Sequence, residues 1–143
     1  MIEIQNLTTS DIDEYFVRNV IEAALATEIS NDQIIIEVAF VGSERIKKLN
    51  KKYRHKNKAT DVLSFGGEGK YLGEIVVCIS EVKKQSKLAR VPYSRELAHV
   101  LIHGTLHLLG YEHEGSVKKT EEMHSREEEI MKSLNLLDPR FNF

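Results

Sequence analysis

The chain has 143 residues, 41% of them hydrophobic and 29% charged, which is enough to bury a core, and we expect one domain over residues 1–143. The formal net charge of -2 gives no general attraction for nucleic acid, so any such binding must come from a local basic patch. A single cysteine, Cys78, rules out an internal disulfide, and no apolar run is long enough to cross a membrane. Because the N-terminus also lacks a signal segment, these features predict a cytoplasmic protein.

The first third of the chain changes from strand to helix periodicity and back. Residues 1–7 alternate apolar and polar side chains, which predicts a half-buried strand. The hydroxyl residues at 8–10 are expected to cap a helix that runs to about residue 27, with its apolar side chains on one face. Residues 33–41 are dense in β-branched side chains and predict a central strand, and a short basic helix is expected at 44–52.

The remaining elements predict a mixed fold. Two apolar runs, residues 62–65 and 71–80, flank a glycine-rich turn and favour an antiparallel hairpin. Pro92 separates two helical segments, because proline disfavours helix at the residue before it. Helices are expected over residues 81–89, 93–109 and, after a cap at Ser116, to about 134. Strands and helices do not alternate strictly, so we predict an α+β fold, a small mixed sheet packed by helices.

Three histidines in the second half of the chain have the spacing of metal ligands. His103 and His107 are four residues apart, so on a helix they lie on the same face one turn apart. Gly110 can adopt a positive φ, end the helix and bring His113 back over the first two imidazoles. Three imidazoles favour a first-row transition metal, most simply one Zn²⁺ per chain, with a fourth position left for water. This is the arrangement of a catalytic rather than a structural zinc site.

The spacing of these histidines allows two other interpretations. His99 extends the stripe and could replace His113, but it lies two turns from His107, roughly 12 Å on a straight helix, which is too far to share an ion. A packing role or a role behind the ligands suits His99 better. The ligand spacing also matches that of the metzincin peptidases, but Gly104 stands where those enzymes carry their catalytic glutamate. Gly104 itself indicates a close approach to the helix, by substrate or by another element.

A basic segment without acids precedes the hairpin. Its cations are suited to contact phosphates without reading sequence. We single out Arg54 as a catalytic candidate, because a guanidinium holds a phosphate with two donors and is always charged. The other predicted RNA-binding residues are Lys47, Lys48, Lys51, Lys52, Lys56 and Lys58.

Two segments resemble the signatures of a known family. The sequence HGTLHLLGYEH, with Glu112 where aspartate is usual, resembles one signature of the YbeY family of bacterial zinc-dependent endoribonucleases. The segment from Leu49 to Phe65 resembles the second signature of this family, which reads Leu-Asn-x-x-Tyr-Arg followed by Pro-Thr-Asp-Val-Leu-Ser-Phe. Ala59 stands in place of the proline. The matching positions are Leu49, Asn50, Tyr53, Arg54, Thr60, Asp61, Val62, Leu63, Ser64 and Phe65.

The resemblance implies the same α+β architecture, a catalytic role for Arg54, and action on small-subunit ribosomal RNA and the ribosome. We therefore predict metal-dependent hydrolysis of single-stranded RNA in ribosomal RNA maturation, with zinc activating water and Arg54 stabilising charge on the phosphate. The general base stays open between metal-activated water alone and assistance by Glu112 or Glu114. Two alternatives stay open as well: a zinc peptidase, and a non-catalytic ribosome- or RNA-binding module in which the metal only fixes the turn at His113.

Overall fold

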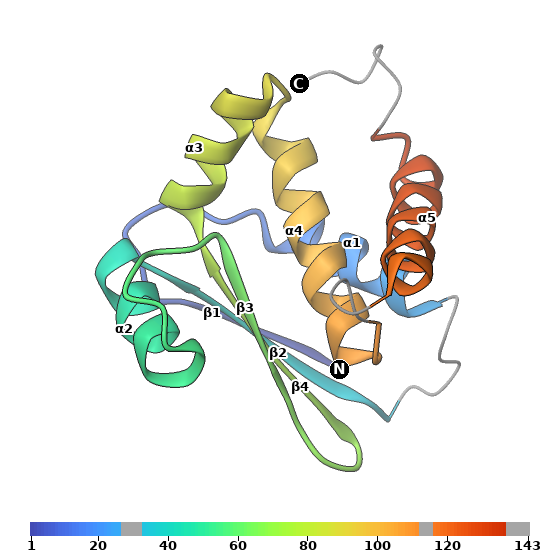
Figure 1. The fold of residues 1–143 in the computed structure, drawn as a ribbon, viewed down its shortest axis with the longest axis horizontal. Coiled ribbons are helices and arrows are strands. Elements are labelled where there is room, and N and C mark those ends of the chain that lie inside the picture. The colour runs from blue at the N-terminus through green and yellow to red at the C-terminus, as the bar shows by residue number, and fades with distance from the viewer. Residues whose placement is uncertain (27–32, 112–115, 137–143) are drawn as a thin grey trace.

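The computed structural model describes residues 1–26, 33–111 and 116–136 of the chain. The described part contains strands and helices in mixed order (Figure 1). They are β1 (Ile2–Asn6), α1 (Glu14–Ala26), β2 (Ile35–Val41), α2 (Ser43–Arg54), β3 (Val62–Gly66), β4 (Tyr71–Cys78), α3 (Ile79–Ala89), α4 (Tyr93–Leu108) and α5 (Val117–Ser133). The predicted α+β class is confirmed, and no helix of the described ranges is long and apolar enough to span a membrane.

The four strands form one mixed sheet in the order β1-β2-β4-β3. β1, β2 and β4 run parallel, and β3 pairs antiparallel with β4, which confirms the predicted hairpin. The central strands β2 and β4 are rich in β-branched residues that are buried on both faces, as expected for strands in the middle of a sheet. The sheet therefore offers two apolar faces, and the helices divide unequally between them.

One face of the sheet carries most of the helices. Alternate residues of β2, including Val38 and Phe40, point into a core shared with α1, α3, α4 and α5. The other face has a smaller cluster, in which Ile46 of α2 packs against Ala39 and Val76. Helix α4 lies between α3 and α5 over the sheet and contacts α1 and the hairpin as well (Figure 1). This central position makes α4 the element on which the site is built.

Helix α4 packs unusually close to the hairpin at Gly104. A Cβ atom at this position would lie 3.0 Å from Cγ2 of Ile75 and 3.1 Å from Oγ of Ser64. The Ser64 hydroxyl also donates to the Gly104 carbonyl oxygen, at 3.3 Å. The sequence left open whether substrate or another element approaches the helix at Gly104. In the structure the sheet does so, and this contact fixes the distance between α4 and β3.

The start of α1 differs from the sequence prediction. The helix begins at Glu14, and the Asp13 carboxylate accepts from the Phe16 N–H at 3.1 Å, so Asp13 supplies the cap in place of the hydroxyls of residues 8–10. Thr8 instead donates its N–H to the Asn6 side chain in a local turn, at 2.9 Å. Asparagine and aspartate compete well for such local bonds, so a hydroxyl-rich stretch need not cap the helix that follows it. The cap at Ser116 is confirmed, since its hydroxyl accepts from the Lys119 N–H.

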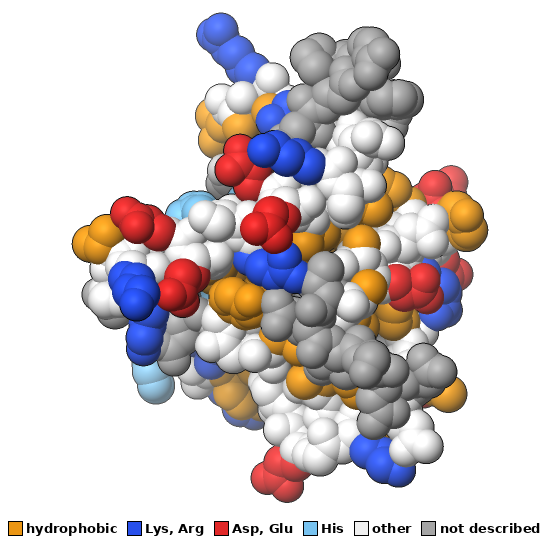
Figure 2. All heavy atoms as spheres, turned by 90° about the vertical axis from the view of Figure 1, so that its right-hand side faces the viewer, with side chains coloured by type: hydrophobic (Ala, Val, Ile, Leu, Met, Phe, Trp, Pro, Cys, Tyr) orange, Lys and Arg blue, Asp and Glu red, His pale blue; other side chains and the backbone are white. Residues whose placement is uncertain are grey.

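Three acidic side chains gather on one face of the sheet, whereas acidic and basic side chains are mixed on another face of the molecule (Figure 2). Glu3, Glu37 and Glu74 lie directly opposite one another on β1, β2 and β4, on the face that carries α2. Burial, and after it the neighbouring Glu37 carboxylate, raises the pKa of Glu74. Figure 2, by contrast, shows acidic and basic side chains interspersed over the described part of the face on the right-hand side of Figure 1. On the sheet, the three aligned carboxylates repel one another, and this repulsion lowers the stability of the folded state.

Candidate functional site

Two of the three predicted metal ligands face each other on α4. The Nε2 atoms of His103 and His107 lie 3.0 Å apart, and both side chains are half-buried. The helix ends as the sequence predicted: Gly110 has a φ of +100°, and its N–H donates to the His107 carbonyl oxygen. The α-helical spacing thus brings two imidazole nitrogens to one point at the end of the helix.

The third predicted ligand, His113, lies outside the described residues, and so do the two candidate bases Glu112 and Glu114. Over the described ranges, no group of three or more histidine, cysteine, aspartate or glutamate side chains is placed to hold a metal ion. The pair His103 and His107 is therefore the described part of the predicted ligand set.

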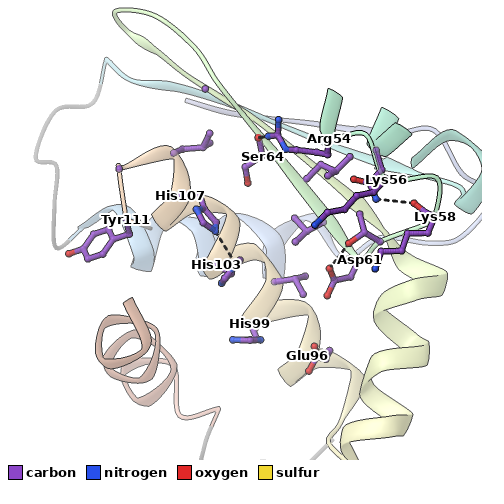
Figure 3. Close-up of a pocket in the computed structure, with 18 residues that line it drawn as sticks. Arg54, Lys56, Lys58, Asp61, Ser64, Glu96, His99, His103, His107 and Tyr111 are labelled. Carbon is purple, nitrogen blue, oxygen red and sulfur yellow. Dashed lines mark hydrogen bonds between the residues drawn. The ribbon is translucent and has the colours of Figure 1, made fainter. Parts of the chain in front are cut away.

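A cavity of about 1080 Å³ opens beside the two imidazoles, and we call it the central cleft. One wall is α4, with His99, His103 and His107, and the other is the segment from the end of α2 through β3 (Figure 3). Tyr111 lies at the end of the α4 wall. The cleft is therefore lined by both segments that carry the family signatures.

Arg54, the last residue of α2, lines the wall opposite the histidines. Its Nη2 donates to the Ser64 carbonyl oxygen at 2.7 Å, and its guanidinium lies 5.1 Å from the centre of the Phe65 ring. The arginine is thus held by β3 through one nitrogen and through its position over the Phe65 ring, although it lies at the surface. A guanidinium has five N–H donors, so one bond to a carbonyl leaves donors for a phosphate in the cleft.

The basic segment divides into two groups. Lys56 and Lys58 line the central cleft, whereas the α2 lysines Lys47, Lys48, Lys51 and Lys52 do not. The loop after α2 is shaped by His55, which adopts a left-handed conformation with a φ of 60°, and by the buried Asn50, whose side chain donates to the Lys58 carbonyl oxygen at 2.9 Å. With this loop conformation Lys56 and Lys58 line the cleft, which the charge pattern alone did not predict.

Sequence reasoning missed Glu127, which lies on α5 behind the histidines. The residue is 4% exposed, and its Oε2 lies 2.8 Å from His99 Nε2 and 3.3 Å from His103 Nδ1. Burial by itself would raise the pKa of Glu127, but the hydrogen bonds from His103 and His99 outweigh it and lower the pKa to about 2. The hydrogen bond between His99 and Glu127 also raises the pKa of His99. A signal was present in the sequence, because this glutamate interrupts the inward apolar stripe of Met123, Ile130 and Met131.

The chain is similar to known proteins of one family. The family model of the endoribonuclease YbeY matches residues 3–135. The chain is 35% identical over 137 residues to an endoribonuclease YbeY of Persephonella marina, covering 91% of this chain and 89% of the relative. It is 34% identical over 152 residues to that of Bacillus cereus strain B4264, covering 95% and 97%.

The structure of the chain is also similar to a solved one. The solution structure of TM1509 from Thermotoga maritima matches with a TM-score of 0.63 and 28% sequence identity, covering 94% of this chain and 92% of that one. The family match spans both sides of the central cleft, including the two described histidines and Arg54. The chain therefore belongs to the YbeY family of endoribonucleases and, as a member, is a hydrolase of the nuclease class.

Proposed function

We propose that the central cleft hydrolyses phosphodiester bonds of single-stranded RNA with the help of one bound Zn²⁺, in the maturation of ribosomal RNA. The observation that carries this proposal is the arrangement of the cleft, with two converging imidazoles on α4 and an anchored arginine on the facing wall. The ribosomal substrate and the ribosome as partner follow from the family resemblance.

The two imidazoles fit a zinc ion. Two nitrogen ligands at about 2.1 Å from one tetrahedral ion lie roughly 3.4 Å apart, and the Nε2 atoms of His103 and His107 are 3.0 Å apart, so a small shift of the side chains would admit the ion. A carboxylate behind a ligand imidazole, as Glu127 is behind His103, is a common feature of such sites. In the proposal, His103, His107 and His113 hold the ion, which would supply Lewis-acid chemistry by polarising a phosphoryl oxygen and acidifying water.

The protein side chains position the RNA and stabilise charge. Lys56 and Lys58 attract the phosphates of the backbone into the cleft, in a manner that does not depend on sequence. Arg54, held in place by the Ser64 carbonyl and the Phe65 ring, presents its remaining donors to the phosphate that reacts. Because the guanidinium is already oriented, it stabilises the charge that develops in the transition state without a reorganisation cost.

The structure argues against a zinc peptidase. That chemistry needs a glutamate directly after the first histidine ligand, where this chain has Gly104. Even a Cβ atom at position 104 would contact Ile75 and Ser64 at 3.0 and 3.1 Å, so the sheet occupies the space that a glutamate side chain requires. The position faces the hairpin, and a peptidase base could not be accommodated there without moving α4.

The test is cleavage of a labelled single-stranded RNA by the purified protein. The metal-loaded protein should cut it internally, a strong chelator should stop the reaction, and added Zn²⁺ should restore it, while a casein substrate remains intact. A non-catalytic binding module would give a different result. In a filter-binding assay it would bind the RNA before and after chelation, and it would produce no fragments. Undiminished cleavage by the chelated protein would contradict the metal requirement.

A further inference from the structure

A buried carboxylate on α5 lies directly behind the α4 histidines. Glu127 belongs to the inward face of α5, between Met123 and Ile130, which are 0% and 2% exposed. A charged group in such a position is costly unless its lone pairs are taken up by donors. No buried side-chain nitrogen or oxygen in the described ranges lacks a hydrogen-bond partner, so the cost at Glu127 is offset by its contacts. Its two short contacts go to His99 and His103 of α4.

One oxygen of Glu127 receives both bonds. Oε2 lies 2.8 Å from His99 Nε2 and 3.3 Å from His103 Nδ1, whereas the other oxygen, Oε1, lies 3.8 Å from Nδ1 of His124. An ionised carboxylate can only accept hydrogen bonds, so each of these two imidazole nitrogens must carry its hydrogen. In neutral His103 the hydrogen is then on Nδ1, which leaves the lone pair on Nε2, the atom that faces His107.

We propose that Glu127 is a positioning residue that holds His103 with its Nδ1 protonated and its Nε2 lone pair directed at the metal position, and that His99 keeps the carboxylate in place. This inference rests on the proposed function, since it concerns a metal held by His103 and His107. It assigns a role to α5, which packs against the ligand-bearing helix α4. It also gives His99 a role other than ligand, since one imidazole nitrogen of His99 donates to the carboxylate and the residue lines the cleft.

A merely structural role for Glu127 makes different predictions. If the carboxylate only joined α5 to α4, its loss would lower the free energy of unfolding and leave the folded site unchanged. If it positions His103, its loss changes the imidazole itself, even in metal-free protein that is fully folded. The hydrogen on His103 could then move to Nε2, and the affinity for metal should fall by about 10- to 100-fold, as for other carboxylates behind ligand histidines.

The experiment compares Glu127→Gln, which keeps the size of the side chain, with Glu128→Gln as the matched control on the exposed side of α5. The affinity for Zn²⁺ is measured by competition with a chelator, and the tautomer of His103 by long-range ¹H–¹⁵N NMR spectra of the metal-free proteins. We expect Nδ1–H in the unaltered protein and in Glu128→Gln, and a mixture with Nε2–H and weaker Zn²⁺ binding in Glu127→Gln. Should Glu127→Gln fold poorly, His99→Gln tests the same carboxylate, with a smaller loss of affinity expected.

The outcomes separate this inference from the proposed function. If the unaltered protein binds one Zn²⁺ and Glu127→Gln binds it equally well with an unchanged His103 tautomer, the positioning role is refuted and the metal site stands. If the unaltered protein binds no Zn²⁺, the proposed function fails, and the role of Glu127 toward a metal fails with it.

Discussion

Gly104→Ala is the substitution that best tests how the site is assembled. The added Cβ atom has two opposite effects on the free energy of unfolding, because it favours the helix and crowds the hairpin. Alanine favours a helix over glycine by about 1 kcal/mol. The added Cβ, however, would lie 3.0 Å from Cγ2 of Ile75 and 3.1 Å from Oγ of Ser64, whereas carbon atoms pack best at about 3.5–4.0 Å. Helix and hairpin would have to separate by roughly half an ångström.

The packing cost should exceed the helix gain. Ile75 is 0% exposed in the middle of β4, so it cannot turn away, and overpacking in such a core costs about 1–3 kcal/mol. Subtracting the gain of about 1 kcal/mol in helix propensity leaves a net loss of roughly 1 kcal/mol. The separation would also move His103 and His107 away from Arg54, which is held to β3. Turnover should therefore fall by about 10- to 100-fold, since small misplacements of reacting groups are costly.

Urea unfolding of Gly104→Ala should show a lower midpoint at an unchanged slope, and Zn²⁺ affinity should change little because both described ligands stay on one helix. Gly73→Ala is the severe reference, since its Cβ would lie 2.3 Å from the Phe65 carbonyl oxygen at a φ of +144°. A Gly104→Ala protein that is more stable than the parent by about 1 kcal/mol would show that only helix propensity acts, and the close contact of α4 with the hairpin would be refuted.

Three further predictions concern the charges. Arg54→Lys should bind RNA nearly as well but lose about 10²–10³ in single-turnover cleavage, because an ammonium cannot make the two-pronged contact; a parental rate would reduce Arg54 to a member of the basic segment. Changing Lys56 and Lys58, which line the central cleft, to Gln should make the salt dependence of RNA binding shallower, by about 0.7 log–log units per lost contact, and an unchanged slope would refute their contact with phosphates. Glu74→Gln should raise the free energy of unfolding at pH 7 by about 0.5 kcal/mol. Because the native state raises the pKa of Glu74, acidification protonates the parent and should remove this gain, so a pH-independent difference would contradict the like-charge account.

Local patterns predicted the elements well, because amphipathic periodicity and turn residues act over short distances. The strand at 1–7 was predicted from its alternation, the strand at 33–41 from its β-branched residues and the hairpin from two apolar runs around a glycine-rich turn, and the structure has them within a residue or two at their ends. The error at the start of α1 arose where several polar residues could cap, and Asp13 rather than a hydroxyl does so. Which strands pair, and that α4 lies over the hairpin, depend on long-range packing that no local pattern carries.

Local spacing predicted the part of the site that lies on one helix. The pair His103 and His107 follows from helical spacing, and Arg54 was singled out by its chemistry and by the resemblance, but its anchoring by Ser64 depends on tertiary structure. Glu127 reaches the site from an element 24 residues beyond His103 and was overlooked among the many charges of α5. A charged residue within an inward apolar stripe is the signal to examine in such a helix.

The central claim, that a metal held by the α4 histidines performs the cleavage, is tested most directly by stepwise reactivation. Metal-free protein is titrated with Zn²⁺, and bound zinc and the single-turnover rate on single-stranded RNA are measured in the same samples. The rate should rise in proportion to bound zinc and level off at one ion per chain, while His103→Ala and His107→Ala stay inactive over the same range. Full cleavage by the metal-free protein, or proportional reactivation of either variant, would contradict the claim.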